Sequence, residues 1–369
     1  MILIHSAQRL DNDQSDNWVL FDEHIVAVGV GETWREVADK AGEIIDATGG
    51  FLSAPMIETH SHGAAGHAAE DGPEEIRAFV RHLRSKGVGK VIASLVSLSP
   101  ERLISAVEAA KDLANNEQGF LGIHLEGPFI ALEKCGAHDT SAVRAPTDQE
   151  LSGIIAAGVI PGGNVIRSIT LAPELFTESQ LSLLKENGVQ LCLGHTASDY
   201  ERAKSFFAQG GKVVTHTFNA MKPISHKEPG PIPAALENQE VFLELIADGV
   251  HVQPSAAKLI PKERLILVSD SMSAADLGDG EYMLGTLKVK VTDSVARTES
   301  GSLAGSTLSM ATAVENYAGW TGDTRAAIAA ATINPAKAYG LEHGRIEEGE
   351  KAELLLISSD GKLQRSFNL

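Results

Sequence analysis

Strand-like apolar stretches alternate with helical segments from residue 51 onward, and this alternation limits the possible folds more than any other feature. Residues 74–86 carry apolar side chains at 76, 79, 80 and 83, the spacing of one helix face, and residues 88–96 then indicate a buried strand. Helices are predicted near 100–115 and 147–157 and from 177 and 198, between strands at 119–125, 165–171, 189–193, 212–215, 241–247 and 264–268. Together with the stretch that begins at Phe51, these make eight strands in about 280 residues, which predicts a (β/α)8 barrel rather than an open sheet.

Short strands are predicted at both ends of the chain. They fall at 1–4, 18–21 and 24–28, and residues 344–357 are again strand-like. We therefore predict a small β-sandwich domain formed by residues 1–50 and 341–369, with the barrel spanning 51–340. A β insertion is expected near 280–300, followed by a helical region at 306–339.

Composition limits the classes of function. The 369-residue chain is 43% hydrophobic, enough for a large core, and no apolar run approaches the ~18–20 residues that a bilayer crossing requires. Cys135 and Cys192 are too few for a disulfide framework. A net charge of −18 opposes binding to nucleic acid or to an anionic membrane. The expectation is a soluble cytoplasmic protein, in which local donors would have to hold any anionic substrate.

Histidines and carboxylates cluster where the predicted strands end. His60 and His62 lie two apart on one strand, so their side chains face the same side. The third strand ends in His124-Leu-Glu126, and the others contribute His195, His216 and Asp270. Because the chemistry of such a barrel sits at the carboxyl ends of its strands, these residues are predicted to share one rim.

Several imidazoles with a carboxylate suit a divalent ion such as Zn²⁺, which leaves a position open for water and lowers the pKa of that water towards ~7. Asp270 would then be the base that accepts the proton of the water and returns it to a leaving amine. The alternatives are that Asp270 only caps the next segment and that His60 and His62 are surface histidines at a loop mouth.

A series of ordered motifs resembles the amidohydrolase superfamily and, within it, the deacetylases of N-acetylglucosamine 6-phosphate. The motifs are His124-Leu-Glu126-Gly-Pro-Phe129, Lys134-Cys-Gly-Ala-His138, Leu193-Gly-His195-Thr, His216-Thr-Phe-Asn219-Ala-Met221, Glu228-Pro-Gly230, Ile246-Ala-Asp248-Gly-Val-His251, Ser269-Asp270, Gly301-Ser-Leu-Ala-Gly305-Ser-Thr and Asn334-Pro-Ala-Lys337.

The resemblance implies a role for each matching residue. Glu126, His195 and His216 would hold the main metal ion. Asp270 would be the catalytic acid and base, and His138 would stabilise the oxyanion. The backbone N–H groups of Asn219 and Ala220 would meet the sugar phosphate. The rest of the substrate pocket would be formed by Ala137, His138, Asp248, His251, Leu303, Ala304 and Gly305.

The chain departs from the pattern of its relatives at His60 and His62, at Lys227, and at Cys135, where relatives often have lysine or asparagine. Many relatives have Gln-x-Asn where this chain has His60-Ser-His62, so one or two ions per subunit are both possible. Relatives commonly supply an arginine to the phosphate of the neighbouring subunit in a homodimer, and this chain has Lys227 there, which keeps the charge but loses the bidentate fork. Cys135 lies on a loop that is expected to cover the pocket. An unreactive cysteine is favoured there over one with a gating or redox role.

The predicted activity is hydrolysis of the acetamide of N-acetyl-D-glucosamine 6-phosphate to D-glucosamine 6-phosphate and acetate. Two alternatives stay open: the same reaction on the galactosamine epimer, and a non-catalytic scaffold with an amidohydrolase-like barrel. The scaffold would be expected to have lost ligands, whereas every expected ligand position here is filled.

Overall fold

Eight parallel strands form the barrel, as the sequence predicts. The computed structural model describes residues 1–12, 14–342 and 344–369. Its largest sheet contains, in chain order, β6 (Met56–Ser61), β9 (Val88–Leu95), β10 (Phe120–Glu126), β13 (Ile166–Leu171), β14 (Gln190–Leu193), β15 (Val213–Val214), β16 (Phe242–Ile246) and β17 (Leu265–Val268). Neighbours in the chain are neighbours in the sheet, so the strands run around the barrel in sequence order.

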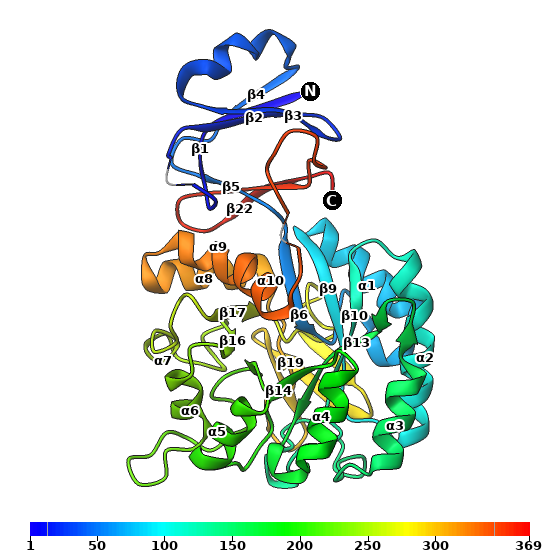
Figure 1. Ribbon diagram of the computed structural model, residues 1–369. Helices are drawn as coiled ribbons and strands as arrows, with labels where there is room; N and C mark the ends of the chain where they lie inside the picture. The colour runs from blue at the N-terminus through cyan, green and yellow to red at the C-terminus, as the bar shows by residue number, and fades with distance from the viewer. Residues whose placement is uncertain (13, 343) are drawn as a thin grey trace.

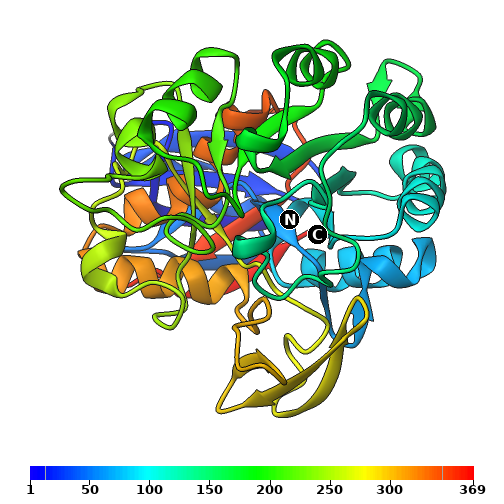
Figure 2. The same cartoon turned by 90° about the horizontal axis from the view of Figure 1, so that it is seen from below.

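Helices cover the outside of these strands (Figure 2). They are α1 (Pro73–Ser85), α2 (Pro100–Asn116), α3 (Asp148–Ala157), α4 (Glu178–Glu186), α5 (Tyr200–Ala208), α6 (Pro231–Glu237) and α7 (Pro254–Ala257). The side chains of Ser99, Thr147, Thr177 and Asp199 cap α2 to α5 by accepting a backbone N–H three residues ahead. Helices α6 and α7 were not predicted, because both are short and start with proline.

The predicted helical region at 306–339 is three helices rather than one. They are α8 (Met310–Thr321), α9 (Thr324–Ala331) and α10 (Ile333–Tyr339). Gly322, with φ +70°, ends α8, and the side chain of Asp323 caps α9 by accepting the N–H of Ala326. These two residues therefore break a segment whose composition is helical throughout.

The barrel closes at the carboxyl ends of its first and last strands. Beyond the end of β17, the Asp270 N–H donates to the His60 carbonyl at 2.8 Å, and the His62 N–H donates to the Ser271 carbonyl at 2.8 Å. The buried carboxylate of Glu58 also joins the two sides, accepting the N–H groups of His60 at 2.9 Å and Ser269 at 3.1 Å. This closure brings Asp270 beside His60.

A second sheet is built from both ends of the chain and is stacked on one end of the barrel (Figure 1). Strand β1 (Ile2–Arg9) pairs along one edge with β2 (Asn17–Phe21). Its other edge pairs first with β4 (Glu43–Asp46) and then, farther along, with β5 (Phe51–Ser53). The other strands are β3 (Ile25–Val30), β21 (Leu354–Ile357) and β22 (Leu363–Phe367). Their shared core includes Ile4, Val19, Phe21, Leu52, Leu354, Leu356 and Phe367.

This β unit contains strands that were not predicted as well as those that were. Of the tail predicted at 344–357, only β21 forms a strand, and β22 was not predicted. Residues 13 and 343 fall within the predicted β domain but lie outside the described residues. Phe51–Ser53, which we expected to lead directly into the barrel, instead pairs with both β1 and β21. Among the described helices, none has the length and apolar character needed to cross a bilayer.

The predicted β insertion is an antiparallel sheet that projects from one side of the barrel (Figure 2, gold). It consists of β18 (Gly280–Leu284), β19 (Leu287–Thr292) and β20 (Val295–Thr298). Leu284, Val289 and Val291 pack with Val96 and Met272, which lie beyond the ends of barrel strands β9 and β17. The insertion is thereby fixed next to the rim that holds the predicted site.

Gly122 lies at a register shift in the pairing of β10 with β9. There is no room for a side chain at this position. Its φ is +137°, and a Cβ there would lie 2.3 Å from the Val165 carbonyl oxygen. We expect Gly122→Ala to lower the free energy of unfolding by about 1–3 kcal/mol or more, because both the backbone conformation and the contact are unfavourable. Urea denaturation measures this.

Gly163→Ala is the matched control for Gly122→Ala, since a Cβ at Gly163 meets nothing within 4 Å. Its midpoint should stay close to that of the wild type, within roughly 0.5 kcal/mol. Equal urea midpoints for the two alanine variants would contradict the explanation that Gly122 is needed at the register shift between β9 and β10.

Candidate active site

Glu126, His195 and His216 meet at the carboxyl rim of the barrel. Glu126 Oε1 lies 3.2 Å from His195 Nε2 and 3.0 Å from His216 Nε2, and the two imidazole nitrogens are 3.0 Å apart. All three side chains are buried. They come from the ends of β10, β14 and β15, so strand order in the barrel brings together residues up to ninety positions apart.

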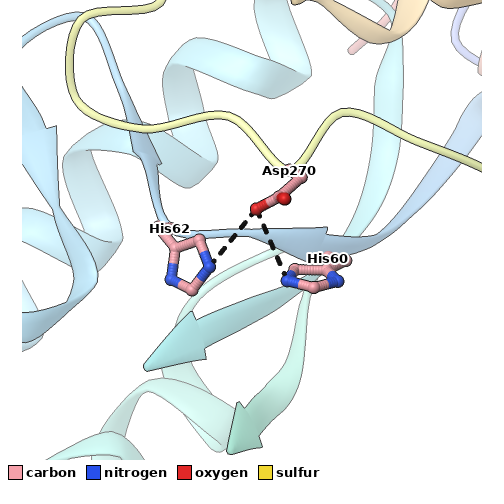
Figure 3. A group of neighbouring side chains, drawn as sticks. All are labelled: His60, His62 and Asp270. Atoms are coloured by element: carbon pink, nitrogen blue, oxygen red, sulfur yellow. Dashed lines mark ion pairs between the residues drawn. The ribbon is translucent and has the colours of Figure 1, made fainter. Parts of the chain in front are cut away.

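His60, His62 and Asp270 form a second buried triad beside the first. Asp270 Oδ1 lies 3.5 Å from His60 Nε2 and 3.4 Å from His62 Nε2 (Figure 3). The two histidines project from the end of β6, and Asp270 reaches them from the segment after β17. His60 and His62 are at most 2% exposed. They are therefore not surface histidines at a loop mouth, which was the alternative left open by the sequence.

The carboxylate of Glu126 lies between the two triads. Its Oε1 faces His195 and His216, while its Oε2 lies 3.0 Å from His62 Nε2. Oε1 also lies 3.5 Å from His60 Nε2. One carboxylate therefore offers an oxygen atom to each triad, which is the arrangement that two neighbouring ions could share.

Three residues of the two triads have positive φ angles. His195, His216 and Asp270 have φ values of +45°, +28° and +48°, in the region that residues other than glycine rarely adopt. Each of them lies just past the end of its strand, where the left-handed backbone turns the chain and directs the side chain inward. Local strain of this kind, on the order of 1–3 kcal/mol per residue, concentrates at functional sites.

Hydrogen bonds to Nδ1 fix the tautomer of two of the triad histidines. His195 Nδ1 lies 2.7 Å from the Lys134 carbonyl oxygen, and His62 Nδ1 lies 3.1 Å from the Ser94 carbonyl oxygen. A carbonyl oxygen only accepts, so each Nδ1 carries the proton and donates it. In the neutral ring, Nε2 then presents a lone pair to the cluster, as a metal ligand must.

His138 has the opposite tautomer. The backbone N–H of Ser97 donates to His138 Nδ1 at 3.1 Å, and the Ser97 hydroxyl lies 2.8 Å from the same atom. Because a backbone N–H only donates, Nδ1 must accept, and burial lowers the pKa of His138 and keeps the ring neutral. Its proton is therefore on Nε2, 3.4 Å from Glu126 Oε2, which makes His138 a hydrogen-bond donor into the site.

The electrostatics of the cluster favour positive charge between the triads. Burial lowers the pKa of His60, but the carboxylates of Asp270 and Glu126 outweigh burial and raise that pKa well above its ordinary value. Burial raises the pKa of Asp270, yet His60 and His62 outweigh it and hold the pKa at about 2. Ionised carboxylates beside imidazole lone pairs are a donor set that divalent metal ions fit, so the residues match the metal that the sequence predicts.

A cavity of about 510 Å³ opens above the two triads. Of the residues predicted to bind substrate, it is lined by Ala137, His138, Asn219, Ala220, His251, Leu303 and Gly305. Sequence reasoning assigned no pocket role to several other lining residues, namely Val96, Glu133, Lys134, Leu284 and Ser302. Leu284, Ser302 and Leu303 show that the β insertion and the turn after it form one wall.

Other predicted substrate residues do not line this cavity. Ala304 is fully buried and its N–H donates to the Ala296 carbonyl, because the insertion packs over it. Asp248 lies behind His251, with its Oδ2 2.6 Å from His251 Nδ1. Lys227 lies in a separate hollow with Asp199, Tyr200, Glu201, Lys222 and Glu228.

The backbone amide of Asn219 also differs from expectation. It donates to the His216 carbonyl at 3.0 Å, so it is engaged within its own turn rather than facing the cavity. Ala220 next to it has a φ of +50° and lines the cavity.

His124 marks the end of the third strand in the sequence but belongs to neither triad. Its Nδ1 lies 2.9 Å from Ser94 Oγ and its Nε2 lies 2.7 Å from Thr170 Oγ1, so both nitrogens are engaged with hydroxyl groups inside the barrel. Burial lowers the pKa of His124 well below its ordinary value, which keeps it neutral. Its neighbour two residues on, Glu126, is the one that reaches the rim.

The groups that support the imidazoles were missed by sequence reasoning. Ser94, Ser97 and Glu244 each contact a ring nitrogen of a site histidine. Serines carry no distinguishing signal in the sequence. Glu244 does, since a carboxylate within the otherwise apolar strand Phe242–Ile246 is a buried charge that requires a partner.

The barrel, the shared carboxylate and the two histidine-rich triads define a metal-dependent hydrolase of the amidohydrolase type. The amidohydrolase family model matches residues 51–368, and the chain belongs to this family.

Several relatives are deacetylases of phosphorylated amino sugars. The N-acetylgalactosamine-6-phosphate deacetylase of Escherichia coli O157:H7 is 35% identical over 330 residues, covering 85% of each chain. The N-acetylglucosamine-6-phosphate deacetylase of Bacillus subtilis is 33% identical over 320 residues, covering 83% of this chain and 80% of the relative.

Solved structures show the same similarity. An N-acetyl-D-glucosamine-6-phosphate deacetylase variant from Mycobacterium smegmatis, in complex with N-acetyl-D-glucosamine 6-phosphate, superimposes with a TM-score of 0.88 at 30% identity. The match covers 99% of this chain and 97% of that one. The enzyme from Thermotoga maritima gives a TM-score of 0.85 at 32% identity, again over 99% and 97% of the two chains.

Proposed function

We propose that this protein hydrolyses the acetamide of N-acetyl-D-glucosamine 6-phosphate to D-glucosamine 6-phosphate and acetate. The observation that carries the proposal is the convergence of six buried side chains, Glu126 and five around it, below a cavity into which His138 presents an N–H. A structure similar over nearly the whole chain binds this same sugar phosphate. The free cysteines Cys135 and Cys192 agree with the cytoplasmic location that is part of the proposal.

Divalent ions, with Zn²⁺ the best fit to nitrogen and oxygen donors, would be held by the two triads. Glu126, His195 and His216 would bind one ion, and His60, His62 and Asp270 offer a site for a second, with the Glu126 carboxylate next to both sets of residues. When bound, such ions polarise a carbonyl group and make water a nucleophile at neutral pH.

Asp270 and His138 would divide the proton chemistry. The Asp270 carboxylate, with its pKa held at about 2, is ionised at neutral pH and so is able to accept a proton from the attacking water. It would return that proton to the departing nitrogen. His138 would donate its Nε2–H to the carbonyl oxygen as negative charge develops there, because Ser97 keeps the proton on that nitrogen.

Substrate binding must overcome the net charge of −18. His251, held by Asp248, and the Ala220 turn face the cavity and would meet the sugar phosphate. Burial raises the pKa of Asp248, but contact with His251 outweighs burial and lowers it, so the carboxylate stays ionised behind the ring. The contact with Asp248 therefore fixes the orientation of the His251 ring in the cavity wall.

A galactosamine substrate is the second candidate, because the relative of that specificity from Escherichia coli O157:H7 is 35% identical to this chain. The two epimers differ in one hydroxyl group, and a site built around that hydroxyl separates them kinetically.

Steady-state kinetics on four sugars, with metal analysis of the same preparation, tests the function directly. We expect the highest kcat/KM with N-acetyl-D-glucosamine 6-phosphate, a lower value with its galactosamine epimer, and little turnover of either unphosphorylated sugar. The reverse order of the two phosphorylated sugars would favour the second candidate. No turnover, with less than about one metal equivalent per chain after supplementation, would indicate a non-catalytic scaffold instead.

Replacing Asp270 by Asn tests the acid and base role. The amide is nearly isosteric but does not accept the proton, so kcat should fall by roughly 10²–10⁴-fold. Thermal stability and the ion bound at Glu126, His195 and His216 should be preserved, which metal analysis and calorimetry measure. Wild-type turnover in this variant would show that Asp270 is not the base.

We also propose that the protein is a homodimer in which Lys227 reaches the phosphate site of the neighbouring subunit. Within one subunit Lys227 lies outside the cavity, in the hollow beside Lys222, which supports a role across an interface. The expected result for Lys227→Ala is a rise in KM of about tenfold or more for the phosphorylated sugar, since a hydrogen bond to a charged group contributes ~1.5–3 kcal/mol.

The exposed Lys258, on a different part of the chain, provides the control for Lys227→Ala and should leave KM unchanged when replaced by alanine. Light scattering of the purified protein gives its mass. A monomer that retains full activity would exclude the contribution across subunits.

A further inference from the structure

His60 is held from behind by the carboxylate of Glu244. His60 Nδ1 lies 3.3 Å from Glu244 Oε2, and the two residues are 0% and 2% exposed. Glu244 comes from β16, so the contact crosses the barrel interior to reach the end of β6. No residue of either triad supplies this contact, and Glu244 lies outside the ligand set already described.

The position of the Glu244 carboxylate is fixed by its other oxygen. Oε1 accepts from Thr59 Oγ1 at 3.2 Å and from the Tyr339 hydroxyl at 3.5 Å. Tyr339 belongs to α10, which ties the carboxylate to the helix layer as well as to β6. The group is therefore a fixed acceptor rather than a mobile charge.

The opposite nitrogen of His60 points into the cluster. Among the described residues, His60 Nε2 is a buried atom with no hydrogen-bond partner, and it lies 3.5 Å from both Asp270 Oδ1 and Glu126 Oε1. With the Nδ1 proton directed to Glu244, Nε2 is free to present a lone pair to a cation at this point. An unpartnered buried nitrogen facing two carboxylates is itself a sign of a missing ligand.

We propose that Glu244 is a positioning residue that strengthens the ion site of His60, His62 and Asp270 by accepting the Nδ1–H of His60. A carboxylate behind a ligand histidine orients the ring and makes its free nitrogen a better donor. The histidines at the neighbouring triad differ in this respect, since His195 is backed by the neutral Lys134 carbonyl. Glu244 thereby gives the site at β6 a tighter hold on its ion than the imidazoles alone would have.

This inference rests on the proposed two-ion centre. The experiment below tests the two-ion centre and the role of Glu244 separately. Metal-free protein is titrated with Zn²⁺ by calorimetry, and with Co²⁺ while the visible absorption of the bound ion is followed. In the wild type we expect two binding events. In Glu244→Gln, which keeps the shape but loses the charge, the affinity of the ion at His60 and His62 should fall by roughly 10–100-fold, with a change in its Co²⁺ spectrum.

The ion at Glu126, His195 and His216 should keep its affinity within about twofold in the same variant, since Glu244 contacts none of these residues. Glu117→Gln is the matched control. Glu117 is also a buried carboxylate, held by Arg77 and Arg81 at 2.9 Å on the outer helices, and its loss should leave both binding events unchanged.

A wild-type protein that binds a single ion would refute the two-ion centre, and with it the role given to Glu244. Two ions in the wild type, with the same two affinities and the same Co²⁺ spectrum in Glu244→Gln, would overturn the inference about Glu244 alone. The near-ultraviolet circular dichroism of the metal-free variant establishes that its packing matches the wild type.

Discussion

The carboxylate of Glu126 is the point on which the site depends, because it contacts both histidine-rich triads at once. Its oxygens lie 3.0 Å from His216 Nε2 on one side and 3.0 Å from His62 Nε2 on the other. Four carboxylates, those of Glu58, Glu126, Glu244 and Asp270, are buried within the barrel at 7% exposure or less. Burying four carboxylates is costly unless cations or protons are held beside them. The negative charge of these carboxylates therefore favours both the histidines around them and the metal ions that the histidines would bind.

The second nitrogen of each histidine determines what the first can do. His62 and His195 donate Nδ1–H to carbonyl oxygens and so turn a lone pair inward, whereas His138 accepts from the Ser97 N–H and turns a proton inward. Neighbouring imidazoles thereby present opposite groups to the site, a lone pair from His62 and His195 and an N–H from His138. The difference comes from backbone groups, so substitution of surrounding side chains would not easily exchange the roles.

The sequence carried enough information to predict the barrel and the rim, because strand alternation and strand order determine where chain ends meet. Residues at strand ends, such as His195 and Asp270, could be placed on one rim for that reason. The outer contacts could not be predicted, since they are made by the Ser94 carbonyl and the Ser97 N–H, and every non-proline residue has such backbone groups. The full burial of Ala304 could not be predicted either, because a motif does not reveal which of its residues a neighbouring sheet covers.

The seam between β6 and β17 explains why the proposed base and the first pair of histidines are adjacent. Regular pairing stops here, and the Asp270 N–H instead donates to the His60 carbonyl while the Glu58 carboxylate joins the backbones of His60 and Ser269. Freed from strand geometry, Asp270 adopts a φ of +48° that no regular strand permits, and its side chain turns toward the rings. Burial raises the pKa of Glu58 to about 7, so the group at this seam is held by donors yet carries its charge only partly at neutral pH. The barrel therefore closes through a few polar contacts rather than through a regular ladder, and the same contacts hold Asp270 beside His60.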